Sequence, residues 1–316
     1  MRMRTVGRSG LRVSTLGLGT MGWGNEVDAE TAGDLLSEFR DAGGTLVDTA
    51  YGYGDGDSET ILGSLLAPHR DDLVLCTKAG ISRTSGTRVV DTSRGALLNQ
   101  LDTSLRRLRT DRVDLWLVHA WSDESPVQET VSAMAYAVTS GRARYVGVSN
   151  HNGWQLARVA TLLAAQGIAL VVDQVEYSLI ERSVEHDVVP AADHLGVGLM
   201  SWGPLGGGVL TGKYRHGVPA DSRAAGGRHG NWAGQRVSHE LHPMIDAVTT
   251  AAHGLHITPV QVALAWLRER PGLAGAVVGA RTAAQLRMAL GSEDIELPYQ
   301  VRAALDEVSA PVAAAG

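Results

Sequence analysis

Eight short apolar runs recur along this chain of 316 residues, and their recurrence limits the possible folds more than any other feature. Each run has the length of a buried strand, and amphipathic patterns with helical periodicity lie between them. Continuous apolar strands that alternate with helices are typical of parallel sheets covered by helices. The expected strands are 15–19, 45–48, 73–78, 113–119, 145–149, 171–176, 198–202 and 275–280. The expected helices are 29–42, 94–108, 127–139, 154–165, 184–195 and 259–270.

Eight such units match the size and order of a closed (β/α)8 TIM barrel. The alternative is an open doubly wound sheet, in which a glycine-rich fingerprint directly follows the first strand. The segment Gly17-Leu18-Gly19-Thr20-Met21-Gly22 superficially fits that fingerprint. However, no helix of the required kind follows it, and no acidic residue stands about 20 residues later at a strand end. The sequence therefore predicts one (β/α)8 barrel domain over residues 1–316.

Three segments fall outside this alternation. Residues 1–13 read as a small β-hairpin that turns at Arg8-Ser9-Gly10. Residues 203–239, after the seventh strand, are rich in Gly, Arg and His and show no periodicity, as is typical of a functional or disordered loop. We expect this insertion to cover a cofactor, and residues 310–316 to form a flexible tail.

Composition narrows the class of protein. The chain is 44 % hydrophobic and carries a net charge of -6, which argues against broad binding to nucleic acid or membranes. No apolar run approaches the roughly 20 residues of a membrane span, and the amino terminus is polar, so we expect a cytoplasmic protein. The single cysteine, Cys76, excludes an intramolecular disulfide and a cysteine-based metal site. We expect no metal site of any kind, and the oligomeric state stays open.

Four polar side chains stand at or just after expected strand ends. Asp48 ends the second strand, Lys78 the third and His119 the fourth, and Tyr53 lies on the loop after Asp48. In a barrel all strand carboxyl ends share one rim, so these side chains should face one another. Lys78 and Lys213 are the two lysines among 28 basic residues, which suggests that each has a task arginine cannot perform.

The chemistry of this group favours carbonyl reduction. A tyrosine has an ordinary pKa of about 10, and a neighbouring ammonium held by a carboxylate should lower it, giving a general acid. A neutral histidine can orient a carbonyl oxygen beside the phenol. Such a site still lacks a reductant, which implies a nicotinamide cofactor as hydride donor.

Six motifs carry a resemblance to a known family. They are Asp48-Thr49-Ala50-Tyr51-Gly52-Tyr53-Gly54, Thr77-Lys78, Asp114-Leu115-Trp116-Leu117-Val118-His119, Gly147-Val148-Ser149-Asn150, Gln174-Val175-Glu176-Tyr177 and the run from Trp202 to Tyr214. Over about residues 3–297 the chain resembles the aldo-keto reductase family. The resemblance implies a (β/α)8 barrel that binds NADPH in an extended form and reduces aldehydes or ketones, with Asp48, Tyr53, Lys78 and His119 as catalytic residues.

The resemblance also implies a set of cofactor contacts. Ser149, Asn150 and Gln174 would hold the nicotinamide carboxamide, and Trp202 would stack on its ring. The residues expected near the phosphates are Lys213, Arg223, Gly279, Arg281 and Gln285. The three cations among them, Lys213, Arg223 and Arg281, favour NADPH over NADH. The other expected cofactor contacts are Gly19, Thr20, Met21, Asp48, Gly203, Pro204, Leu205 and Gly207. Met288-Ala289 replaces the Glu-Asn pair of most relatives, so the usual adenine contacts are absent or replaced and the strength of the NADPH preference stays open.

The substrate pocket is predicted less directly. The chain lacks a long carboxyl-terminal loop past Leu297, which in many relatives closes over the substrate. The expected substrate contacts are therefore Trp23, Tyr51, Trp121, Trp154 and the 203–239 loop. A sugar ketone, a small aromatic aldehyde and a polyketide-like ketone all fit, because loop composition specifies a pocket only loosely.

Two other functions stay open. The chain also resembles the potassium-channel β subunits, so it could be a cofactor-sensing or partner-binding barrel with little turnover. A Schiff-base lyase that uses Lys78 is less favoured, because Asp48 and the cofactor motifs do not suit it.

Overall fold

The computed structural model describes residues 1–84, 86–215, 217–219, 222–226, 234 and 241–310. Eight parallel strands close into a barrel in the order β10-β11-β12-β3-β4-β5-β8-β9, and the prediction of a (β/α)8 barrel is confirmed. The barrel strands are β3 (Leu16–Gly19), β4 (Leu46–Asp48), β5 (Val74–Ala79), β8 (Val113–Val118), β9 (Ala143–Ser149), β10 (Leu170–Glu176), β11 (Gly198–Trp202) and β12 (Leu273–Val278).

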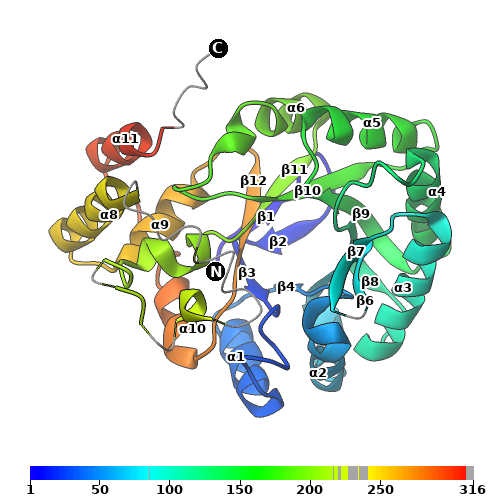
Figure 1. Ribbon diagram of the computed structural model, residues 1–316, viewed down its shortest axis with the longest axis horizontal. Helices are drawn as coiled ribbons and strands as arrows, with labels where there is room; N and C mark the ends of the chain where they lie inside the picture. Colours follow the sequence, from blue (N-terminus) through cyan, green and yellow to red (C-terminus); the bar gives the residue numbers. More distant parts are fainter. Residues whose placement is uncertain (85, 216, 220–221, 227–233, 235–240, 311–316) are drawn as a thin grey trace.

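Helices surround the barrel on its outer side (Figure 1). Several begin at a residue whose side chain accepts a hydrogen bond from a free backbone N–H of the first turn. Ser93, for example, accepts from Ala96 N at the start of α3. The helices are α1 (Ala29–Asp41), α2 (Asp57–Leu66), α3 (Arg94–Leu108), α4 (Val127–Thr139), α5 (Gly153–Ala164), α6 (Val188–Leu195), α8 (His242–Leu255), α9 (Pro259–Arg268), α10 (Ala283–Leu290) and α11 (Tyr299–Val308).

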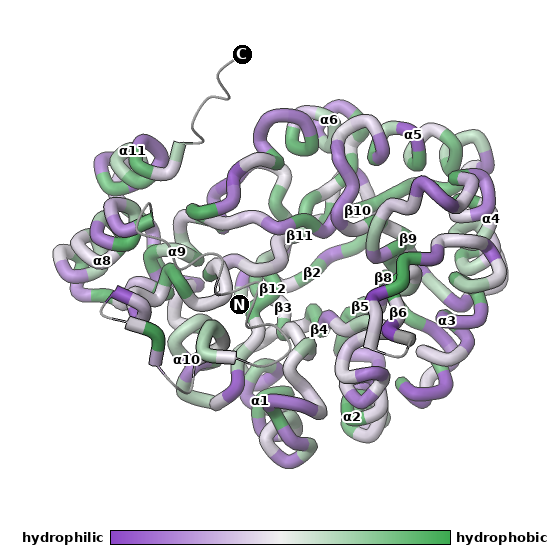
Figure 2. Tube along the Cα trace, in the orientation of Figure 1, coloured by the Kyte–Doolittle hydropathy of each residue, from purple (hydrophilic) through white to green (hydrophobic). Residues whose placement is uncertain are grey.

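Strand side chains are buried on both faces. One face packs with the helices into the large outer core, and the other fills the barrel interior with residues such as Leu46, Cys76, Leu115 and Met200. Figure 2 shows apolar strands at the centre and alternating polar and apolar stretches along the outer helices. This double burial explains why the strands read as continuous apolar runs in the sequence.

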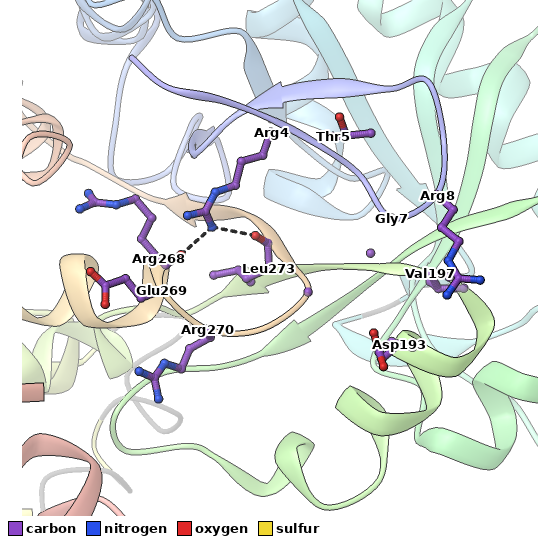
Figure 3. A pocket seen from close by; sticks show the side chains of 14 residues that line it. Arg4, Thr5, Gly7, Arg8, Asp193, Val197, Arg268, Glu269, Arg270 and Leu273 are labelled. Carbon is purple, nitrogen blue, oxygen red and sulfur yellow. Dashed lines mark hydrogen bonds between the residues drawn. The ribbon is translucent and has the colours of Figure 1, made fainter. Parts of the chain in front are cut away.

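The predicted amino-terminal hairpin is present as β1 (Met3–Thr5) and β2 (Arg12–Ser14). It lies at the end of the barrel where the strands begin, beside a cavity of about 480 Å³ (Figure 3). There Arg4 Nη1 donates to the carbonyl oxygens of Arg268 and Leu273 at 2.5 and 3.0 Å. These bonds join the hairpin to the last residue of α9 and the first residue of β12, so this cavity lies where the hairpin closes the amino-terminal end of the barrel.

A second antiparallel hairpin, β6 (Ile81–Thr84) and β7 (Thr87–Val90), follows β5 directly and was not expected from the sequence. Short 3-10 turns complete the described structure: η1 (Tyr53–Gly56), η2 (Arg70–Asp72), η3 (Ser183–Glu185), η4 (Gly206–Thr211) and η5 (Arg223–Ala225). Much of the predicted 203–239 loop, and residues 311–316 of the predicted tail, lie outside the described residues. Within the described part of the chain, no helix is long and apolar enough to cross a membrane.

Candidate active site

Three polar side chains meet where β4 and β5 end. Lys78, in β5, places Nζ 2.6 Å from Oδ2 of Asp48, the last residue of β4. The same ammonium donates to the carbonyl oxygen of Thr49 at 2.9 Å and to the hydroxyl of Tyr53 at 3.4 Å. The structure therefore joins the predicted acid, ammonium and carboxylate in one chain of contacts.

Burial governs the charges of this group. Burial acts to lower the pKa of Lys78, but the charge of Asp48, aided by Tyr53, outweighs it, so that pKa is raised and the lysine is an ammonium. Burial also raises the pKa of Tyr53, and the opposing charge of Lys78 is too small to reverse this. The expectation of a lowered phenol pKa is thus wrong, because desolvation exceeds the effect of the neighbouring cation. Tyr53 holds its proton at neutral pH.

His119 follows β8 and stands beside the phenol. Its backbone N–H donates to Ala79 O at 2.8 Å, and its ring meets that of Tyr53 edge-on with centroids 5.8 Å apart. Burial, and then the charges of Lys78 and Arg88, lower the pKa of His119 well below its ordinary 6.5, so the imidazole is neutral. Its buried Nδ1 has no hydrogen-bond partner among the described residues.

Polar side chains of the neighbouring strands continue the network. Gln174 on β10 donates from Nε2 to Asp48 Oδ1 at 2.8 Å, and Ser149 Oγ donates to the Gln174 carbonyl at 2.7 Å. Asn150, at φ 59, donates to the carbonyl oxygen of His119 and to Ser149 Oγ, both at 3.0 Å. Asn150 Oδ1 in turn accepts from the indole N–H of Trp202 at 2.9 Å, which fixes the orientation of that ring.

A cavity of about 730 Å³ opens over these groups. Its size suits a ligand larger than a small substrate alone. It runs from Tyr53 and His119 to residues that follow β11 and β12. The residues lining it that the sequence had assigned to the cofactor are Gly19, Met21, Asp48, Ser149, Asn150, Gln174, Trp202, Gly203, Pro204, Leu205, Gly207, Lys213, Gly279, Arg281 and Gln285. Met288 and Ala289 line it as well.

Comparison with known proteins gives the family. The model of the Aldo/keto reductase family matches residues 15–310, nearly the whole barrel. The chain belongs to the aldo/keto reductase family.

Three relatives show the range of proteins to which this chain is similar. It is 34% identical over 320 residues to an uncharacterized oxidoreductase, YrpG, of Bacillus subtilis (strain 168), covering 98% of this chain and 96% of that protein. It is 32% identical to a probable voltage-gated potassium channel subunit beta of Arabidopsis thaliana, covering 98% and 95%. It is 34% identical to the L-glyceraldehyde 3-phosphate reductase of Escherichia coli (strain K12), covering 90% and 86%. Membership of this family and the relative that is named as an oxidoreductase support an oxidoreductase activity.

The cavity of this aldo/keto reductase fits a nicotinamide dinucleotide. Along one wall the chain turns through Gly207 and Gly208 at φ 68 and 95, where backbone amides can approach a phosphate. A Cβ added to Gly208 would lie 2.8 Å from Lys213 Nζ, so the absence of a side chain leaves room for that cation. Among the described residues no cluster of His, Cys, Asp and Glu could hold a metal ion.

Two expected cofactor contacts are not placed on the cavity. Thr20 is fully buried beneath it and bonds to the Asp48 carbonyl and to Ser58, a structural role. Arg223 begins η5, but its side chain lies outside the described residues.

The aromatic residues expected at the substrate also lie elsewhere. Trp23 is 1% exposed and belongs to the outer core. Tyr51 stacks under the Arg107 guanidinium, 4.7 Å from its ring centroid. Trp121 packs edge-on against His151 and against Trp154, which is 57% exposed. None of these four side chains lines the cavity.

The sequence reasoning missed the contribution of the β6–β7 hairpin. Ile81, Arg83 and Arg88 from this hairpin line the cavity near Tyr53 and His119. The sequence does carry a hairpin signal, since Ser85-Gly86 separates two short segments that contain β-branched residues. That signal was available, but it lies inside what reads as a connection between a strand and a helix.

Proposed function

We propose that this protein catalyses the NADPH-dependent reduction of an aldehyde or ketone to an alcohol. The observation that carries the proposal is the buried chain of contacts from Asp48 through Lys78 to Tyr53, beside a neutral His119 on the wall of a cavity of dinucleotide size. The Escherichia coli relative, named as a reductase of L-glyceraldehyde 3-phosphate, supports carbonyl chemistry.

The chain's own residues divide the work of binding. NADPH, when bound, supplies the hydride that reduces the carbonyl carbon. Ser149, Asn150 and Gln174 would hold its carboxamide, and Trp202 offers an aromatic face to its ring. Lys213, Arg281 and Arg223 would meet its phosphates, and guanidinium groups suit a ribose 2′-phosphate, which favours NADPH over NADH.

The proton comes from Tyr53. Its raised pKa keeps the phenol protonated and ready to donate to the carbonyl oxygen as that oxygen gains negative charge. The ammonium of Lys78 then stabilises the phenolate left behind, and Asp48 keeps Lys78 charged and in place. A neutral His119 retains one N–H, which can donate to the same carbonyl oxygen and orient it toward the phenol.

The test is NADPH consumption over a panel of aldehydes, ketones and keto-sugars by the native protein and by Tyr53→Phe. The variant keeps the ring but removes the proton, so turnover should vanish while NADPH binding, followed by calorimetry, persists. Tyr51→Phe is the matched control, because that ring lies under Arg107 and outside the cavity. Retained turnover in Tyr53→Phe would refute the assignment.

The same experiment separates the alternatives. NADPH binding without turnover on any carbonyl would favour a cofactor-sensing or partner-binding barrel, in keeping with the relatives named as potassium channel subunits. A Schiff-base lyase needs a neutral lysine, whereas Asp48 holds Lys78 as an ammonium. If borohydride traps a substrate on Lys78 without any nicotinamide, that result would support the lyase instead.

A further inference from the structure

The β6–β7 hairpin occupies a distinct position on the barrel rim. It follows β5, which lies between β4 and β8, the strands that lead to Tyr53 and His119. The strand that leads to Lys213 is β11, four places from β5 in the ring of eight. The hairpin therefore stands across the barrel mouth from the proposed phosphate-binding residues, and Figure 1 shows β6 and β7 on the opposite side from α10. It is next to the reaction centre and remote from the cofactor phosphates.

Two arginines face each other on this hairpin. Arg83 and Arg88 are directly paired in the antiparallel register, and both line the 730 Å³ cavity. Like charges placed opposite each other across two strands destabilise the pairing. No carboxylate of the described residues forms an ion pair with either guanidinium, and both side chains are exposed. The pair is thus a concentrated positive charge without a counter-ion among the described residues.

The other charged residues of the cavity also favour the binding of an anion. Asp48 is the one acidic residue among the described residues that line it, and it is already bound to Lys78 and Gln174. The positive charge of Arg88 also extends to the reaction centre, where it contributes to the low pKa of His119. A second anion, besides the cofactor phosphates, would therefore be bound favourably at this end of the cavity.

We propose that Arg83 and Arg88 form a subsite for an anionic group on the substrate, a carboxylate or a phosphate, so that the preferred substrates are negatively charged aldehydes or ketones. This inference rests on the proposed reductase function and names its substrate class. Guanidinium groups suit both anions because their fork of donors matches paired oxygens. The anion lies in a part of the substrate that does not react, so we expect the arginines to hold it equally well in the ground state and the transition state and to act chiefly on KM.

The experiment compares substrates with and without an anionic group; the two members of the first pair have nearly the same shape, and those of the second differ by the phosphate itself. para-Carboxybenzaldehyde is set against para-formylbenzamide, and glycolaldehyde phosphate against glycolaldehyde, with NADPH as donor. We expect kcat/KM to favour the anionic member by about tenfold or more, the effect of one charged hydrogen bond. Arg83→Gln and Arg88→Gln should each reduce this preference, mainly through KM, and the double variant should abolish it. Arg106→Gln, an exposed arginine on α3 away from the cavity, should leave it unchanged.

The outcomes are separable. A preference seen with one pair alone identifies the anion as carboxylate or phosphate. Equal kcat/KM within both pairs, or a preference that survives the double variant, overturns the subsite. If no carbonyl is reduced, the reductase proposal fails. The anion subsite is then tested by calorimetry, which compares the binding of terephthalate and of terephthalamide to the NADP⁺-loaded protein. Terephthalate binding that needs both arginines supports it, and equal or absent binding of the two overturns it.

Discussion

Replacing Asp48 by Asn should lower the free energy of unfolding by about 3–5 kcal/mol near neutral pH, the usual cost of removing one partner of a buried ion pair. The Lys78 and Asp48 side chains are 1% and 4% exposed and lie 2.6 Å apart. Asn keeps nearly the same shape, and its amide oxygen can still accept the hydrogen bond from Gln174. The loss should therefore come from the ammonium, which becomes a buried charge without a counter-ion.

This cause predicts a dependence on pH. In the native protein the folded-state pKa of Lys78 is raised, so the stability from the ion pair is fully present below the unfolded pKa of about 10.4 and is lost only as pH rises through the folded pKa. In Asp48→Asn, burial acts without the opposing carboxylate and depresses the folded pKa of Lys78. The unfolded state then binds more protons, so the variant gains stability as pH rises toward the unfolded pKa.

The assay is urea unfolding near pH 7 and again at about pH 9.5 for the native protein, Asp48→Asn, Lys78→Met and the double variant. We expect the deficit of Asp48→Asn to shrink at the higher pH. The double variant should be more stable than Asp48→Asn, since it buries no charge. A deficit below about 1 kcal/mol, or one independent of pH, would refute the reasoning.

Two further predictions follow from the same electrostatics. Because burial, Lys78 and Arg88 hold the pKa of His119 well below 6.5, kcat/KM should show no histidine titration above that pH; a pH profile with an inflection near 6.5 that is lost in His119→Asn would contradict this. Arg107→Ala should lower the free energy of unfolding by about 3 kcal/mol, because it leaves the fully buried Glu59 without its ion-pair partner at 3.1 Å. Urea unfolding beside Arg107→Lys tests this, and a loss equal in both variants would show that charge is not the cause.

The barrel could be predicted because its strands carry a strong local signal. Every expected strand overlaps an observed one, with ends displaced by at most two residues, as at β9 and β12. Four helices, α2, α8, α10 and α11, were not expected. In α2 the helix begins at Asp57, directly after glycine-rich turns that read as loop. In α11 the apolar residues Val301, Leu305 and Val308 follow helical spacing, so the signal for this helix was available in the sequence.

The position of the proposed catalytic group could be predicted for a geometric reason. Asp48, Lys78 and His119 stand at strand ends, and the closure of the sheet alone brings such positions to one rim. The substrate residues had no such support. Trp23 lies only a few residues beyond β3, but the chain turns back at a bridge between Trp23 and Val27 and places the indole in the core. Whether a loop side chain faces a cavity depends on packing between distant segments, which no local pattern records.

The same contrast explains how one barrel can keep its chemistry and change its substrate. The proposed proton donor and the neighbouring ammonium are held by β4 and β5, and a shift of either strand would disturb the core on both faces. The β6–β7 hairpin is an insertion beyond β5, so its side chains can change with little effect on the barrel. Its arginines stand next to the reacting groups and across the mouth from the proposed cofactor phosphates. In the proposed reaction, charge placed there affects which carbonyl is reduced, whereas the side chains at the strand ends supply the proposed chemistry.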